Sequence, residues 1–185
     1  MSEYIYELKI PKQRIAVLVG TQGEVKSRIE EATQTKIKID SKEGDVFISG
    51  EDNIKLFSCQ LIIKAISRGF NPDKAMLLLK TDYAFEMINI SDYAKTQADI
   101  IRLRGRVIGK QGKSRKTIED ITNCYISVFG KTISLIGSVE NVPLTLRAVE
   151  KLLKGSTHSK VYNWLERKKS EFKEALNSIK KEENE

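Results

Sequence analysis

Gly109-Lys110-Gln111-Gly112 is a Gly-x-x-Gly tetrapeptide, and Gly20-Thr21-Gln22-Gly23 is an earlier copy of the same motif. Each copy follows an apolar run and precedes a segment with helical periodicity. Because glycine has no side chain, a phosphodiester can approach the backbone of such a turn closely. The start of the next helix adds unpaired N–H groups and the positive end of a dipole. The two tetrapeptides therefore predict turns shaped for the backbone of a nucleic acid.

The tetrapeptides belong to two copies of one longer repeat. In each copy an alternating strand pattern precedes a short apolar helix, the glycine loop, a second helix, two strands and a last helix. The last helices are predicted over about 53–68 and about 139–154, each ending at a glycine, Gly69 or Gly155. This β-α-α-β-β-α order resembles a type I KH domain, which clamps about four nucleotides. We expect an α+β fold of two tandem type I KH domains, each a three-stranded antiparallel sheet with helices on one face.

The segments outside the two repeats are predicted to be helical. Asn71-Pro72-Asp73 is typical of a helix start, and the apolar residues after it do not suit a solvated tether, so we expect a short rigid linker. The C-terminal segment is predicted to be an amphipathic helix with a frayed tail. Its apolar stripe, which includes Trp164, either packs on the adjacent domain or docks a partner. The predicted boundaries are 1–70 for the first KH domain, 71–82 for the linker, 83–155 for the second KH domain and 156–185 for the helix and tail.

The positive charge of the chain is concentrated in the second repeat. The whole chain has 32 Lys and Arg residues against 25 Asp and Glu residues. Residues 94–155 hold 12 of the basic and 5 of the acidic residues, whereas 1–69 hold 11 and 10. A run of cations is often only a solvated face, but a run on both sides of a phosphate-binding turn indicates a binding surface. The cations of this run are Arg102, Arg104, Arg106, Lys110, Lys113, Arg115 and Lys116.

The second repeat is therefore the predicted RNA-binding copy. The two glycines permit close approach of the RNA backbone, the loop cations neutralise phosphates, and Arg104 and Arg106 extend the basic track. Apolar residues on the flanking helices are expected to form the floor on which bases lie, although each one also fits the core. The predicted RNA-binding residues are Arg104, Arg106, Val107, Ile108, Gly109, Lys110, Gln111, Gly112, Lys113, Arg115, Lys116 and Ile118.

The first glycine loop lacks comparable charge. Thr21 and Gln22 are neutral and Glu24 follows them, so a phosphate gains little attraction there. We interpret this repeat as a scaffold or protein-docking copy. Its residues for an auxiliary contact with RNA or a partner are Gly20, Thr21, Gln22, Gly23, Lys26 and Arg28.

Other functional classes fit the sequence poorly. Gly112-Lys113-Ser114 resembles the end of a phosphate loop of nucleotide hydrolases, but that motif requires a glycine where Val107 stands. One histidine and two dispersed cysteines provide no ligand set for a metal, and Cys59 and Cys124 are expected to be buried, reduced thiols. No apolar run is long enough to span a bilayer, and the chain begins directly with a strand pattern. We expect a cytosolic, monomeric, non-enzymatic protein without a cofactor.

The chain resembles the archaeal form of the ribosome-assembly family called partner-of-Nob, or Dim-two. The resemblance rests on Ile108 to Glu119, on the junction Arg68 to Ala75, and on the weakened first repeat. It implies a factor that binds single-stranded RNA near the 3′ end of small-subunit ribosomal RNA. It also implies two protein partners, the PIN-domain endonuclease that trims this end and the alpha subunit of initiation factor two.

A protein-interaction scaffold is the alternative. In that case the basic loop contacts an acidic protein instead of RNA. Salt dependence and competition by single-stranded RNA separate the two hypotheses, because RNA binding through several phosphate contacts weakens steeply as salt rises.

Overall fold

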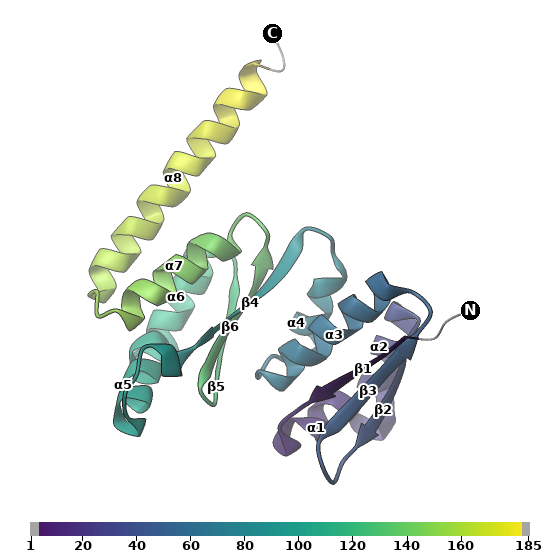
Figure 1. Ribbon diagram of the computed structural model, residues 1–185. Coiled ribbons are helices and arrows are strands. Elements are labelled where there is room, and N and C mark those ends of the chain that lie inside the picture. Colours follow the sequence, from purple (N-terminus) through teal and green to yellow (C-terminus); the bar gives the residue numbers. More distant parts are fainter. Residues whose placement is uncertain (1–3, 183–185) are drawn as a thin grey trace. The chain divides into compact units, whose positions relative to one another are not determined.

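The computed structural model describes residues 4–182, and for Lys173 and residues 175–182 only the backbone is described (Figure 1). Its contacts divide the chain into two compact units. The first extends to Phe85 and includes Ser127–Gly130, and the second comprises Glu86–Ile126 and the chain from Lys131 onward. The domain boundaries expected from the sequence stay predictions.

The first unit contains the predicted β-α-α-β-β-α order. Two short helices follow it, α4 (Pro72–Ala75) and the 3₁₀ helix η2 (Met76–Leu79), so the expected linker is helical, while its rigidity stays a prediction. Asn71 caps α4 by accepting a hydrogen bond from the Lys74 N–H, as the Asn-Pro start predicts. The elements of the repeat are β1 (Tyr4–Lys9), α1 (Lys12–Val19), η1 (Thr21–Gly23), α2 (Glu24–Thr33), β2 (Lys36–Asp40), β3 (Asp45–Gly50) and α3 (Asn53–Ser67).

The second repeat, most of which lies in the second unit, has the same order and is followed by a long C-terminal helix. Its α7 begins three residues later than expected, because Ser138 to Asn141 form a turn and Pro143 occupies the first turn of the helix. Thr96 and Asp99 form a capping box at the start of α5. The elements are β4 (Tyr83–Asn89), η3 (Ile90–Asp92), α5 (Gln97–Ile108), η4 (Lys110–Gly112), α6 (Lys113–Thr122), β5 (Tyr125–Phe129), β6 (Thr132–Ser138), α7 (Val142–Leu153) and α8 (His158–Glu182).

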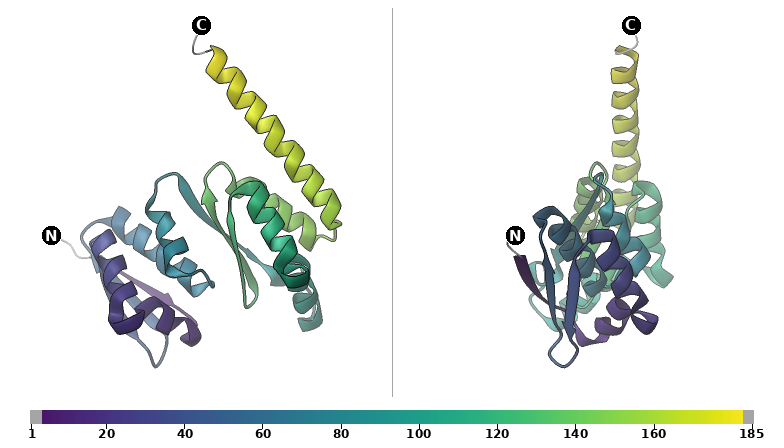
Figure 2. Two further views of the ribbon diagram at one scale, coloured as in Figure 1. Left: turned by 180° about the vertical axis from the view of Figure 1, so that it is seen from behind. Right: turned by 90° about the vertical axis from the view of Figure 1, so that its right-hand side faces the viewer.

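Each unit has one three-stranded antiparallel sheet whose last strand lies in the centre. The strand orders are β1-β3-β2 and β4-β6-β5. In the first sheet Ile48 of β3 lies opposite Tyr6 on one side and Ile37 on the other. The left view of Figure 2 shows that the helices of each repeat lie on one face of its own sheet, whereas α8 packs on α6 and α7 and extends away from them. The predicted α+β fold of two type I KH domains is confirmed.

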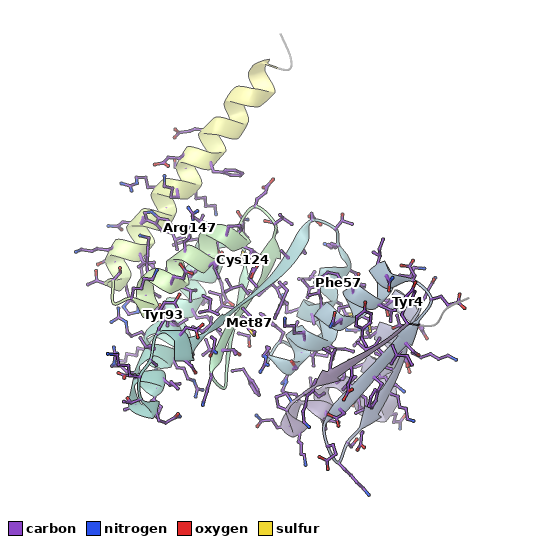
Figure 3. All side chains as sticks on the ribbon, viewed as in Figure 1. Tyr4, Phe57, Met87, Tyr93, Cys124 and Arg147 are labelled. Atoms are coloured by element: carbon purple, nitrogen blue, oxygen red, sulfur yellow. The ribbon has the colours of Figure 1, made fainter. Side chains whose placement is uncertain are left out.

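The core of each unit lies between its sheet and its helices. Both cysteines are buried there as free thiols, as predicted, and burial raises the pKa of each thiol (Figure 3 labels Cys124). Within the described part of the chain, no helix is long and apolar enough to cross a membrane. The largest fully buried side chains include Leu18, Ile29, Ile48, Leu56, Ile62 and Ile66 in the first unit and Leu103, Ile118, Ile133 and Leu135 in the second.

An arginine connects the first helix of the first unit to the end of its last helix. Arg14 of α1 donates from Nε to the Ile66 carbonyl at 2.7 Å and from Nη2 to the Phe70 carbonyl at 2.5 Å. Ile66 is in the last turn of α3 and Phe70 lies three residues beyond its end, a region where carbonyl groups have no partner within the helix. Burial lowers the pKa of Arg14. The guanidinium therefore closes this helix end and fixes α1 against it.

Arg106 makes the equivalent connection in the second unit. It donates from Nε to the Leu152 carbonyl at 3.1 Å and from Nη2 to the Ser156 carbonyl at 2.6 Å. These acceptors match those of Arg14 in the first repeat, but Arg106 lies one helical turn closer to its glycine loop. The Arg106 carbonyl in turn accepts a hydrogen bond from Nε2 of His158, at the start of α8.

We expect Arg106→Ala to destabilise the second unit. The change removes the charged donor from the Leu152 and Ser156 carbonyls, and the Leu152 carbonyl keeps the Gly155 N–H at 3.1 Å, so the free energy of unfolding should fall by about 1.5–3 kcal/mol. Urea unfolding followed by circular dichroism measures this difference. Arg102→Ala, one turn earlier and exposed, is the control and should cost less than about 0.5 kcal/mol. Equal losses in the two variants would contradict a structural role for Arg106.

Candidate nucleic-acid interface

The two glycine loops have the same backbone conformation. In the second loop Gly109 has φ 73° and ψ 174°, and Gln111 has φ 53°. In the first loop Gly20 has φ 74° and ψ −179°, and Gln22 has φ 53°. The last glycine of each loop is also left-handed, with φ 77° and 84°. Because the loops match in shape, any difference in binding between them comes from their side chains.

The first glycine of each loop is required by packing as well as by conformation. A Cβ atom on Gly109 would lie 2.6 Å from Cβ of Ser114, and one on Gly20 would lie 2.5 Å from Cγ2 of Val25. A Cβ on Gly112 would meet nothing within 4 Å. Gly109 thus brings the loop against the start of α6, while Gly112 is needed only for its positive φ and its open face.

The N-terminus of α6 is open for an anion. Gly112 is its N-cap residue and provides no side chain to accept from the first N–H groups. The first turn of α6 contains no acidic residue, whereas the first turn of α2 contains Glu24. A phosphate at α6 therefore meets the positive end of the helix dipole, with no acidic residue in the first turn to oppose it.

Three lysines at the second loop are available to a ligand. Lys110, Lys113 and Lys116 are all exposed, and within the described residues none of them lies within ion-pair distance of a carboxylate. Gln111 at the tip of the loop is also exposed. The combination of three unpaired cations with a glycine turn and an uncapped helix start is suited to the phosphates of a nucleic acid.

Comparison with known proteins agrees with this geometry. The KH domain family model matches residues 5–65, and the model described as a eukaryotic type KH-domain (KH-domain type I) matches residues 84–170. A KH domain-containing protein of Methanocaldococcus jannaschii is 45% identical over 172 residues, which cover 91% of this chain and 75% of that protein. The RNA-binding protein PNO1 of Oryzias latipes is 30% identical and is matched over 84% of this chain and 67% of that protein.

The chain belongs to the archaeal PNO1 (Dim2) family of tandem KH-domain proteins. The resemblance drawn from the sequence is thereby confirmed. A crystal structure of a complex of a/eIF2alpha, aDim2p and rRNA from Pyrococcus horikoshii contains a similar chain. That chain is 40% identical with a TM-score of 0.86, and the match covers 91% of this chain and 96% of that one.

Two of the arginines predicted beside the loop of this PNO1-family chain are engaged by neighbouring groups. Arg115 lies 3.7 Å from the Glu119 carboxylate, one turn further along α6. Arg106 donates to the Leu152 and Ser156 carbonyls, which gives it a structural role, while its predicted part in the basic track stays a prediction. Arg102 of the same basic run pairs with Asp99 at 3.2 Å. These partners are not evident from the basic run itself, because side chains that meet on a helix stand three or four residues apart in the sequence.

The predicted apolar floor also needs correction. Val107 and Ile118 have exposed fractions of 0%, so they belong to the core beneath the loop and offer no surface to a base. Ile108 is partly exposed, so its contact with a base stays a prediction. Arg104 is partly exposed as well, and its Nε is buried without a hydrogen-bond partner among the described residues, so its RNA contact also stays a prediction.

Both cations near the first loop are paired. Lys26 lies 3.7 Å from Glu30, and Arg28 donates to Asp73 at 2.8 Å. With Glu24 at the helix start, the first loop offers the same turn but no free positive charge within the described residues. This contrast favours the second loop as the RNA-binding copy.

The sequence reasoning missed a structural role of one glutamate in each repeat. Glu30 accepts a hydrogen bond from the Ile37 N–H at 2.6 Å, and Glu119 accepts one from the Ile126 N–H at 2.7 Å. Each carboxylate connects the second helix of a repeat to the strand after it. The sequence contained a signal for this role, because Glu30 and Glu119 occupy the same position when the two glycine loops are aligned.

We expect the two glycines of the second loop to differ in their tolerance of alanine. Gly112→Ala meets only the cost of a left-handed backbone, about 1–2 kcal/mol. Gly109→Ala adds a clash with Ser114 and should cost more than about 3 kcal/mol. Thermal and urea unfolding of the two variants measure the difference. A Gly109→Ala variant as stable as Gly112→Ala would contradict the close packing of the loop on α6.

Proposed function

We propose that this protein is a non-enzymatic factor that binds single-stranded RNA through the glycine loop of its second KH domain. One observation carries the proposal: the two loops share a backbone conformation, and among the described residues only the second loop has lysines without an ion-pair partner, Lys110, Lys113 and Lys116. In this arrangement the loop and the start of α6 hold the sugar-phosphate backbone. The bases lie toward the partly exposed side of the flanking helices, and about four nucleotides are bound.

We further propose that the RNA is the 3′ region of small-subunit ribosomal RNA during assembly of that subunit. Support comes from the family, which includes proteins named for RNA binding, and from the similar chain in a complex with rRNA and a/eIF2alpha. The alpha subunit of initiation factor two and a PIN-domain endonuclease are the proposed protein partners. The protein is proposed to act as a monomer in the cytoplasm, where its two thiols stay reduced.

The first KH domain is a candidate for protein docking. It exposes several large apolar side chains on β1 and α3, including Tyr4 at 43%, Ile54 at 79% and Phe57 at 57% (Figure 3 labels Tyr4 and Phe57). Apolar groups gathered at a surface are typical of protein interfaces. Its loop also lacks free cations. We therefore propose that this domain positions the protein on a partner while the second domain binds RNA.

The double substitution Lys110→Asp with Gln111→Asp tests the RNA site. It places two carboxylates at the tip of the loop, so the affinity for single-stranded RNA should fall by about two orders of magnitude. Both residues are exposed, and Asp tolerates the left-handed conformation of Gln111, so the circular dichroism spectrum and melting temperature should stay close to those of the parent. Fluorescence anisotropy with labelled RNA measures the affinity.

The matched control is Thr21→Asp with Gln22→Asp in the first loop. Because that loop has the same backbone and no free cation, this variant should lose less than about threefold in affinity. A comparable loss in both variants would show that both loops bind RNA. Undiminished affinity in the Lys110 variant would refute the proposed site.

The scaffold alternative predicts a different salt response. RNA binding through four or five phosphates should weaken by roughly two orders of magnitude between 50 and 200 mM salt, and unlabelled single-stranded RNA should compete for the site. If an acidic protein binds the basic loop tightly but displaces RNA only weakly, the RNA is not held at the loop. That result would favour the scaffold function. Crosslinking to total cellular RNA identifies the RNA, and one cluster of crosslinks at the 3′ end of small-subunit rRNA is the expected result.

A further inference from the structure

A second group of cations lies on α7 and α8, on elements that do not form the glycine loop. We call it the α7–α8 basic patch. On α7, Arg147 and Lys154 are exposed, and Lys151 is partly exposed (Figure 3 labels Arg147). The three residues stand at i, i+4 and i+7, so they form one stripe about 10 Å long. The opposite side of α7 faces the core through Ala148, Val149 and Leu152.

The N-terminal part of α8 lies along α7 and completes the patch. Val161 and Leu165 are buried and hold α8 on the second unit. Nζ of Lys151 lies 4.9 Å from the centre of the Trp164 ring, which is a cation–π contact between the two helices. Lys160 and Lys168 stand one turn before and one turn after Trp164, so they lie on the same side of α8. The patch members are Arg147, Lys151, Lys154, Lys160, Trp164, Arg167 and Lys168.

Two carboxylates next to the patch, those of Glu150 and Glu171, neutralise only part of its positive charge. Glu171 pairs with both Arg167 and Lys168. Glu150 is 4.0 Å from Lys154 but also lies beside Tyr93, whose pKa is raised by burial and by the charge of Glu150. Within the described residues, Arg147, Lys151 and Lys160 lie in no ion pair with a carboxylate.

The first repeat shows that a KH domain does not require two of the three α7 cations, since only Lys154 has a basic counterpart there, Arg68. In the alignment that equates Gly69 with Gly155, Arg147 corresponds to Leu61 and Lys151 to Ala65. The last helix of the first unit forms with these apolar residues in place. Arg147 and Lys151 are therefore not required by the last helix of a KH repeat.

We propose that the α7–α8 basic patch binds the phosphate backbone of RNA beyond the roughly four nucleotides held at the glycine loop. This inference rests on the proposed RNA-binding function. Cations spread along two adjacent helices match a chain of regularly spaced phosphates, and lysine binds phosphates as a mobile point charge without reading bases. The patch therefore increases affinity for longer RNA without adding sequence preference.

The test compares oligouridylates of 4 and 12 nucleotides with two triple variants. The patch variant is Lys151→Gln, Lys154→Gln and Lys160→Gln. The control variant is Lys95→Gln, Lys131→Gln and Lys169→Gln, which removes the same charge from exposed positions of the second unit outside the patch. Circular dichroism and the melting temperature establish that both variants are folded. Affinities are measured by anisotropy from 50 to 200 mM salt.

We expect the patch variant to bind the 12-mer on the order of tenfold more weakly than the parent, and its salt slope to fall by about 2, as three lost phosphate contacts require. The control variant should lose less than about twofold, and all three proteins should bind the 4-mer equally. Because Trp164 is the single tryptophan of the chain, the 12-mer should also change the tryptophan emission of the parent protein.

Equal losses of 12-mer affinity in the patch and control variants would overturn the proposal, and so would an unchanged tryptophan emission. A polyglutamate peptide that binds the patch more tightly than the 12-mer at the same salt would assign the patch to an acidic protein instead. Binding of the 4-mer tests the RNA-binding role of the glycine loop separately from the role of the patch. If the Lys110→Asp and Gln111→Asp variant binds the 4-mer like the parent, the proposed function fails, whereas the 12-mer comparison still decides the role of the patch.

Discussion

The second KH domain depends on the close contact between Gly109 and the start of α6. There is no room for a Cβ atom between Gly109 and Ser114, so the chain leaves α5, turns within four residues and begins α6 directly. This contact places the N-terminus of α6 directly after the loop that contains Lys110, with Lys113 and Lys116 on its first turns. A phosphate can then meet backbone donors, the helix dipole and unpaired cations together. Without the turn, the lysines would be an ordinary solvated face.

The two repeats show which features belong to the fold and which belong to function. Both keep the glycine turn, the Glu that connects the second helix to the next strand, and an arginine at the end of the last helix. They differ in the charges around the turn and along the last helix. In the first repeat Lys26 and Arg28 are paired, whereas three lysines of the second loop are free among the described residues. One backbone therefore supports two surfaces that differ in charge.

Much of the fold could be predicted from the sequence, because the hydrophobic period changes in the same order twice and the glycines mark the turns. The site was less predictable. Arg106 lies within a basic run, and its role at the end of α7 depends on carbonyls more than forty residues away. Val107 and Ile118 are apolar, as the floor of a base-binding groove requires, but only the packing of α5 and α6 shows that they belong to the core. The patch on α7 and α8 went unnoticed because its cations are separated by core residues in the sequence.

We propose that one of two turns with the same backbone conformation binds RNA because of its charge. The most direct test is an amide NMR titration of the full chain with a single-stranded RNA tetramer. The amide signals of Gly109 to Lys113 should shift on RNA addition, while those of Gly20 to Glu24 stay in place. Equal shifts at both loops, or shifts confined to residues outside both loops, would contradict the account.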